Sequence, residues 1–87
     1  MQHARKDYNE RIQDSAHLIP DEEPVFLVLG RDMVGAATVR AWAHLNKVNG
    51  GSDVCTSSAM RQADRMEAWA SKHGKIADLP KEGDGLE

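Results

Sequence analysis

Apolar residues recur at helical spacing in three stretches of this chain, and a short stretch between them is apolar without interruption. In the first stretch, over residues 6–19, the apolar positions are Tyr8, Ile12, Ala16 and Ile19. Their spacing of four, four and three residues places them on one face of a helix. Pro20 disfavours the helical conformation at the residue before it, so we expect this helix to end near Ile19.

The uninterrupted apolar run ends at a glycine and consists of Val25, Phe26, Leu27, Val28 and Leu29. Because it is β-branched and aromatic, too short for a helix and bounded by proline and glycine, it predicts a short buried strand over about 25–29. A buried helical turn is the alternative. A single buried strand leaves its backbone groups unpaired, so something must pair with it. The candidates are the segment around Ile76, the same strand of a second copy across a two-fold axis, or a strand of another protein.

A second helix is predicted over about 33–49, with Asp32 as its N-cap. Its inward stripe is expected to be Val34, Ala37, Ala41, Leu45 and Val48, widened by Val39 and Trp42. The small side chains of Ala36, Ala37, Ala41 and Ala43 would let another helix approach closely. Asn49-Gly50-Gly51 predicts a left-handed cap at its end.

A third helix is predicted over about 53–73, with Ser52 or Asp53 as its cap and Gly74 after its last residue. Its inward stripe is expected to be Cys55, Ala59, Ala63, Met66 and Ala70, with Met60 and Trp69 at the margins. The short connection between the two helices predicts an antiparallel hairpin, in which Trp42 and Trp69 are the largest packing groups.

These elements predict a mostly helical α+β fold: an N-terminal helix, one short strand over about 25–29, and the helical hairpin. Residues 1–80 are expected to form a single small domain, with Ile76 and Leu79 covering an edge of its core. Residues 81–87 are expected to be a mobile tail, in which Leu86 and Glu87 are interpreted as derived from a purification tag.

Composition narrows the class of protein. With 40% hydrophobic and 29% charged residues among 87, the chain should fold, although a domain of this size is marginally stable and self-association is one ordinary remedy. The net charge of −3, with both signs interspersed, makes nucleic-acid binding less expected. The single cysteine favours a reducing cytoplasm, and the pattern indicates neither a signal peptide nor a membrane span.

Candidate chemistry is sparse. Gly30 and Gly35 have the spacing of a phosphate-binding loop, but the lysine and hydroxyl residues of such a loop are absent, so the glycines are interpreted as serving a tight turn and close packing. Cys55 near a helix N-terminus, with His44 or His73 as base, is the last-ranked hypothesis, because a cysteine in an apolar stripe is usually a small hydrophobe. The histidines share no metal-ligand spacing, and no metal or cofactor is expected.

Several segments together resemble small uncharacterised proteins of bacteriophage and prophage regions in Gram-negative bacteria. They are Glu23 to Leu27, Arg31-Asp32, Val39 to Ala43, Ala63 to Trp69 and Ala77 to Pro80. The resemblance brings no activity, cofactor or catalytic residue, and it implies a cytoplasmic accessory protein that acts through protein contacts.

The function expected from these observations is that of a small non-enzymatic cytoplasmic protein that contacts a protein partner or itself, with a homodimer as one form. The expected interaction residues are the apolar run Val25, Phe26, Leu27, Val28 and Leu29 together with Trp42 and Trp69. The alternative is a nucleic-acid-binding regulator whose Arg31, Arg40 and Arg61 contact phosphates.

Overall fold

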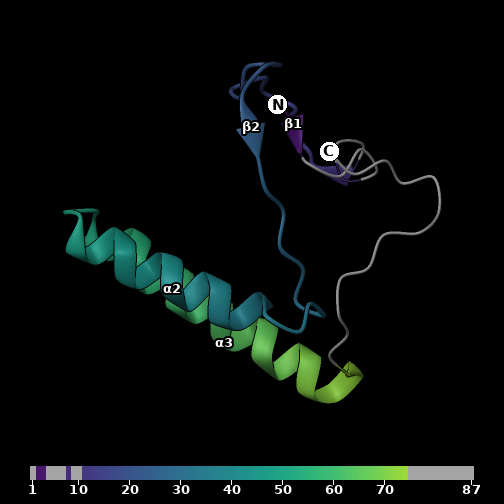
Figure 1. Cartoon of the computed structure of the whole chain (residues 1–87), viewed down its shortest axis with the longest axis vertical. Coiled ribbons are helices and arrows are strands. Elements are labelled where there is room, and N and C mark those ends of the chain that lie inside the picture. Colours follow the sequence, from purple (N-terminus) through teal and green to yellow (C-terminus); the bar gives the residue numbers. More distant parts are fainter. Residues whose placement is uncertain (1, 4–7, 9–10, 75–87) are drawn as a thin grey trace. The chain divides into compact units, whose positions relative to one another are not determined.

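The computed structural model describes residues 2–3, 8 and 11–74. Its elements are strands β1 (Gln2–His3) and β2 (Pro24–Val25) and helices α2 (Gly35–Val48) and α3 (Asp53–His73) (Figure 1). The described residues form two compact units, one up to Leu27 and one from Val28 onward. That residues 1–80 are a single domain stays a prediction, and the expected tail over 81–87 lies outside the described residues.

In the first unit, the predicted strand is shorter than expected and its partner is one that the sequence did not suggest. β2 pairs in parallel with β1, with Gln2 opposite Pro24 and His3 opposite Val25. Residues 26–29 are not in a strand, and Phe26 is 75% exposed. The segment around Ile76, one of the expected partners, lies outside the described residues.

The helix predicted over 6–19 does not extend to Ile19. Tyr8 and Arg11 are helical, and the Ile12 amide donates to the Tyr8 carbonyl over 3.0 Å, but residues 12–19 form turns and irregular backbone. Positions 6, 7, 9 and 10 lie outside the described residues. In this unit the Tyr8 side chain is buried.

Asp14 explains why the helical pattern stops. Its carboxylate accepts the amides of Leu18 and Ile19 at 3.0 and 2.9 Å, and its carbonyl accepts the amide of His17 at 2.9 Å. His17 takes a left-handed conformation with φ of 53°. Short polar side chains offer the backbone an alternative to helical hydrogen bonds, and here that alternative outweighs the apolar spacing.

In the second unit, α2 and α3 pack against each other as the predicted helical hairpin (Figure 1). Ala36, Ala63 and Met66 form the core of the contact, with Val28 and Val39 packed against it. Ala43 and Ala70 are also buried. Small residues on both helices allow the close approach that the alanine content predicted.

The ends of the helices follow the predicted caps with one exception. The Ser52 hydroxyl accepts the Cys55 amide at 3.1 Å, and Gly74, at φ of 93°, follows α3. After α2, Gly50 has φ of 83°, and the amides of Gly50 and Gly51 donate to the carbonyls of Lys47 and Asn46. This pair of bonds is a Schellman motif, which satisfies carbonyls that the helix end leaves unpaired.

The exception is the start of α2, which lies two residues later than predicted. Asp32 accepts the Val34 amide at 2.9 Å, and the Gly35 amide donates to the Asp32 carbonyl at 3.0 Å. The aspartate therefore stabilises a turn before the helix. The residue at the N-cap position is Val34, which makes no side-chain capping bond.

Candidate interaction surface

The apolar stripe predicted to face the core on α2 instead faces solvent. Val34 at the N-cap and Leu45 and Val48 within α2 are 59%, 57% and 62% exposed, and Ala37 and Ala41 are exposed too. We call these five residues, Val34, Ala37, Ala41, Leu45 and Val48, the outer stripe. The opposite side of α2 packs on α3 through Ala36, Val39 and Ala43. The predicted inward face of this helix was therefore wrong.

Periodicity did not decide between the two faces because α2 is apolar on both of them. Positions advance by about 100° per residue, so the outer stripe and the packed residues lie on opposite sides of the helix. The packed side offers Ala36 and Ala43, which let the helices approach closely, whereas Leu45 and Val48 on the outer side would hold them apart.

Polar contacts agree with the packed orientation of α2. Arg40 donates to the Glu67 carboxylate at 3.0 Å and to the Asp64 carboxylate at 3.1 Å, both on α3. These bonds, the one to Glu67 first, raise the pKa of the Arg40 guanidinium. At the other end of the contact, the Asn46 amide donates to the Thr56 hydroxyl at 3.2 Å. The outer stripe is therefore left on the side of α2 away from α3.

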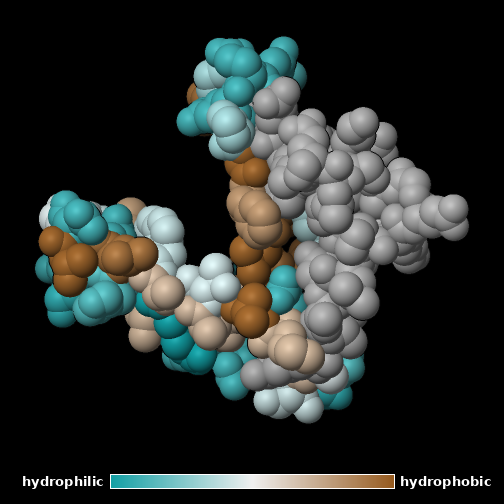
Figure 2. Space-filling view, viewed as in Figure 1, coloured by the Kyte–Doolittle hydropathy of each residue, from teal (hydrophilic) through white to brown (hydrophobic). Residues whose placement is uncertain are grey.

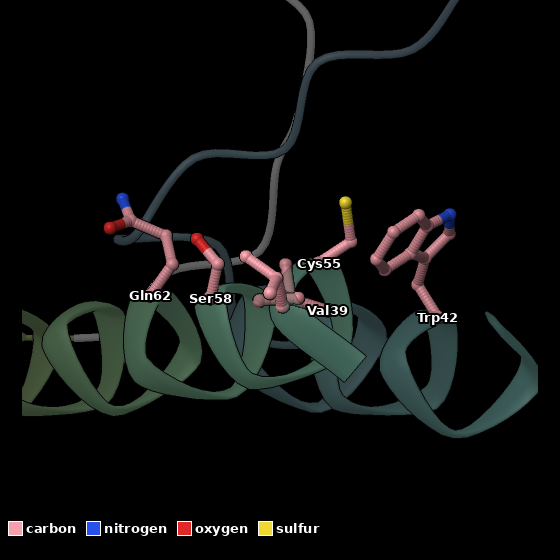
Figure 3. Close-up of a pocket in the computed structure, with 7 residues that line it drawn as sticks. Val39, Trp42, Cys55, Ser58 and Gln62 are labelled. Atoms are coloured by element: carbon pink, nitrogen blue, oxygen red, sulfur yellow. The ribbon is translucent and has the colours of Figure 1, made fainter. Parts of the chain in front are cut away.

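A groove of about 560 Å³ lies beside Trp42, which is 51% exposed. It is lined by Val39 and Trp42 of α2 and by Val54, Cys55, Ser58, Ala59 and Gln62 of α3. Figure 3 shows the labelled side chains pointing to the same side of the helix pair. Figure 2 shows further apolar surface at the end of the pair that carries the connecting turn, where Leu45, Val48 and Val54 are exposed.

Cys55 is exposed in this groove, whereas the sequence placed it in the buried stripe of the third helix. The correction has a local cause. Thr56 is half-buried and bonds to Asn46 of α2, so the contact between the helices passes through Thr56 and continues at Ala63 and Met66. Cys55 lies one residue off this line.

A smaller hollow of about 220 Å³ contains the other tryptophan. It is lined by Leu29, Gly30, Arg31 and Trp69. The Trp69 ring stacks on the His73 ring with centroids 4.1 Å apart, and His73 Nδ1 lies 2.9 Å from the Trp69 carbonyl oxygen. Trp42 and Trp69 thus lie in separate hollows.

The seven expected interaction residues are distributed over both units. Val25, Phe26 and Leu27 belong to the first unit. Val28 packs against the core of the second unit, and Leu29 lines the hollow at Trp69. The outer stripe is an exposed apolar surface that the sequence analysis did not recognise as one. Its signal was present, because helical spacing identified all five residues, but it was interpreted as core.

The groups proposed for chemistry are not brought together. His73 is eighteen residues beyond Cys55 on the same helix, roughly 27 Å away at the helical rise. His44 follows Trp42 by two residues, about 200° round α2, and so faces away from the groove that holds Cys55. Over the residues that the structure describes, no three histidine, cysteine or carboxylate side chains gather as metal ligands would.

Comparison with protein-family models, with curated proteins and with solved structures found no match for this chain. Neither α2 nor α3, the helices within the described residues, has the length and apolar content needed to cross a membrane.

Proposed function

We propose that this chain is a small non-enzymatic cytoplasmic protein that acts by binding another protein chain through the outer stripe of α2. The observation that carries the proposal is the exposure of Val34, Leu45 and Val48, between 57% and 62%, along one face of a helix that already buries its opposite face. Contiguous exposed apolar surface of this kind marks interaction sites on folded proteins.

The composition of α2 supports the proposal. Among its fourteen residues the only ionisable side chains are Arg40, His44 and Lys47, and Arg40 is held by carboxylates of α3. A helix that is apolar on both faces is typical of one covered on both sides. Fully burying one valine or leucine side chain contributes about 1.5 to 3 kcal/mol, which offsets part of the entropic cost of association.

The groove beside Trp42 enlarges the surface available to a partner. Tryptophan is enriched at the energetic centres of protein interfaces, because its large ring buries much area with few rotatable bonds. Trp42 lies on α2 about 100° from Ala41, so a chain that covers the outer stripe can reach its ring as well.

Photo-cross-linking in the native host tests this proposal. p-Benzoylphenylalanine replaces His44, which flanks the outer stripe, or Ser57, which is exposed on α3. We expect a covalent adduct with another polypeptide, either a second copy or a different chain, from position 44 but not from position 57. Absence of any adduct at position 44, with α-helical content retained, would contradict the proposed function.

A second candidate, nucleic-acid binding, is favoured by one observation on α3. Arg61, Arg65 and Lys72 are exposed and four and seven residues apart, which places them on one side of the helix away from α2. Arg40, which the sequence suggested as a phosphate contact, instead pairs with Asp64 and Glu67. Three phosphate contacts predict a log-log salt slope of about −2.7 for duplex DNA.

Fluorescence anisotropy with a labelled duplex tests the second candidate. If the basic row binds phosphates, Arg61→Glu with Arg65→Glu abolishes binding, while the control Lys47→Glu on α2 leaves it intact. A duplex that fails to bind the wild-type protein at low salt eliminates this candidate.

The relationship to phage and prophage proteins stays a prediction.

A further inference from the structure

We infer that the partner of the outer stripe is the α2 helix of a second copy of this chain, packed antiparallel across a two-fold axis at Ala41. This inference rests on the proposed function, because it names the partner that the outer stripe binds. Two observations carry it: the symmetry of the stripe along the helix, and the match of its small and large side chains.

The outer stripe has the same spacing when counted from either end. Its residues are three, four, four and three positions apart, so Ala41 is its midpoint. A two-fold interface joins the same patch on both copies, with each residue meeting its counterpart in reverse order. In an antiparallel pair centred on Ala41, Val34 is level with Val48 of the second copy, and Ala37 is level with its Leu45.

Side-chain sizes along the stripe suit this pairing. Ala41 meets its own counterpart at the axis, where a small side chain lets two helices approach to the short end of the usual interaxial range of about 8 to 10 Å. Each exposed Leu45 lies level with an Ala37, which leaves room for the larger side chain. In a parallel pair the two Leu45 side chains would instead lie level with each other.

Charge is compatible with the same arrangement. No residue of the outer stripe is ionisable, and α2 has no acidic residue. His44 beside the stripe is level with Thr38 of the second copy, and Arg40 is already paired with carboxylates of α3. The antiparallel direction also places the positive end of each helix dipole near the negative end of the other.

The size of the interface is limited by the length of α2. One face of a fourteen-residue helix makes an interface near or below about 1,200 Å², the lower limit of specific interfaces. We therefore expect a dimer that dissociates on dilution.

Disulfide trapping tests both the surface and its register. In a Cys55→Ser background, the Ala41→Cys variant should form a linked dimer on mild oxidation, because the two Cα atoms at the axis lie within the roughly 7 Å that a disulfide requires. The control Ser57→Cys, on the exposed side of α3, should stay unlinked. Absence of the Ala41→Cys product, in protein that keeps its helical circular dichroism, would overturn the inference.

A mixed experiment separates the antiparallel register from the parallel one. Ala37→Cys mixed with Leu45→Cys, both in the Cys55→Ser background, should give mainly the heterodimer. Leu45→Cys alone should link poorly, because its two copies are eight residues apart along the pair, about 12 Å. Efficient linking of Leu45→Cys to itself would contradict the antiparallel arrangement.

These outcomes are distinguishable from failure of the proposed function. If trapping fails but position 44 cross-links to a different polypeptide, the outer stripe binds proteins and only the second-copy inference is overturned. If position 44 gives no adduct and trapping fails, both are overturned. A linked Ala41→Cys dimer together with an unlinked Ser57→Cys control supports both.

Discussion

Gly35 shows how one residue fixes the start of α2 against α3. A Cβ atom at this position would lie 2.5 Å from the Leu29 carbonyl oxygen and 3.2 Å from Cε of Met66. The first distance is a clash with backbone, which cannot move aside as a flexible side chain does. The structure therefore agrees with the interpretation of this glycine as a close-packing residue.

Gly35→Ala should lower the free energy of unfolding by about 1 to 3 kcal/mol, the usual cost of overpacking, as measured by urea denaturation. Gly30→Ala is the matched control, because the nearest atoms to its added Cβ, all of Met66, are 3.6 to 3.8 Å away. Equal stability of the two variants would contradict the packing described for the start of α2.

The ionisation of Asp14 should make the turn at residues 14–19 depend on pH. The backbone hydrogen bond from Ile19, followed by that from Leu18, lowers the pKa of this carboxyl below its ordinary value of 3.8. Because the pKa is lower in the folded chain than in the unfolded chain, the ionised group stabilises the folded chain above the unfolded pKa. That contribution is lost as the pH falls through the folded pKa.

In NMR spectra, the amide signals of Leu18 and Ile19 should therefore titrate together at a pH below 3.8. The Asp14→Asn variant should abolish this titration, while a control, Asp21→Asn, should preserve it. A midpoint at or above the ordinary aspartate value would contradict the hydrogen-bonded turn.

At the scale of elements, signals local to the chain predicted most of the helix ends and the hairpin. Ser52, the Asn49-Gly50-Gly51 cap and Gly74 act through bonds to residues nearby in sequence, so their roles can be inferred without the tertiary fold. The extent of β2 could not be inferred, because it depends on a two-residue partner some twenty residues away. The first helix was overestimated because apolar spacing does not include the competing bonds of Asp14.

The larger error was the predicted orientation of α2. It assigned the residues of the outer stripe to the core, so the candidate surface was not recognised. All five residues of the outer stripe were identified, but a helix that is apolar on opposite sides has two possible inward faces. The choice depends on how closely α3 can approach, which in turn depends on alanines of both helices. A sequence pattern for one helix does not contain that information.

Enlarging an alanine on each face tests this orientation. Ala43→Leu should lower the free energy of unfolding by about 1 to 3 kcal/mol, because Ala43 is fully buried against α3. Ala37→Leu, on the exposed outer stripe, should change the stability of the hairpin little. Thermal or urea denaturation at concentrations low enough to suppress association measures both. A larger loss for Ala37→Leu would mean that the outer stripe faces the core.

For the whole molecule, the two-fold pairing accounts for the composition of α2. One face of the helix packs on α3 of its own chain, and in the inferred dimer the other face would pack on α2 of the second copy. A chain of 87 residues buries a limited fraction of its surface alone, so association adds apolar burial that the hairpin by itself lacks.

Sedimentation equilibrium of the wild-type protein over micromolar to millimolar concentrations tests the inferred pairing of α2 between two copies. The average mass should rise from that of one chain toward that of two. The Ala41→Glu variant, which places two carboxylates at the axis, should keep the mass of one chain while retaining its helical circular dichroism. A wild-type mass of one chain at every concentration, or an unchanged dimer in Ala41→Glu, would contradict the pairing of α2 across Ala41.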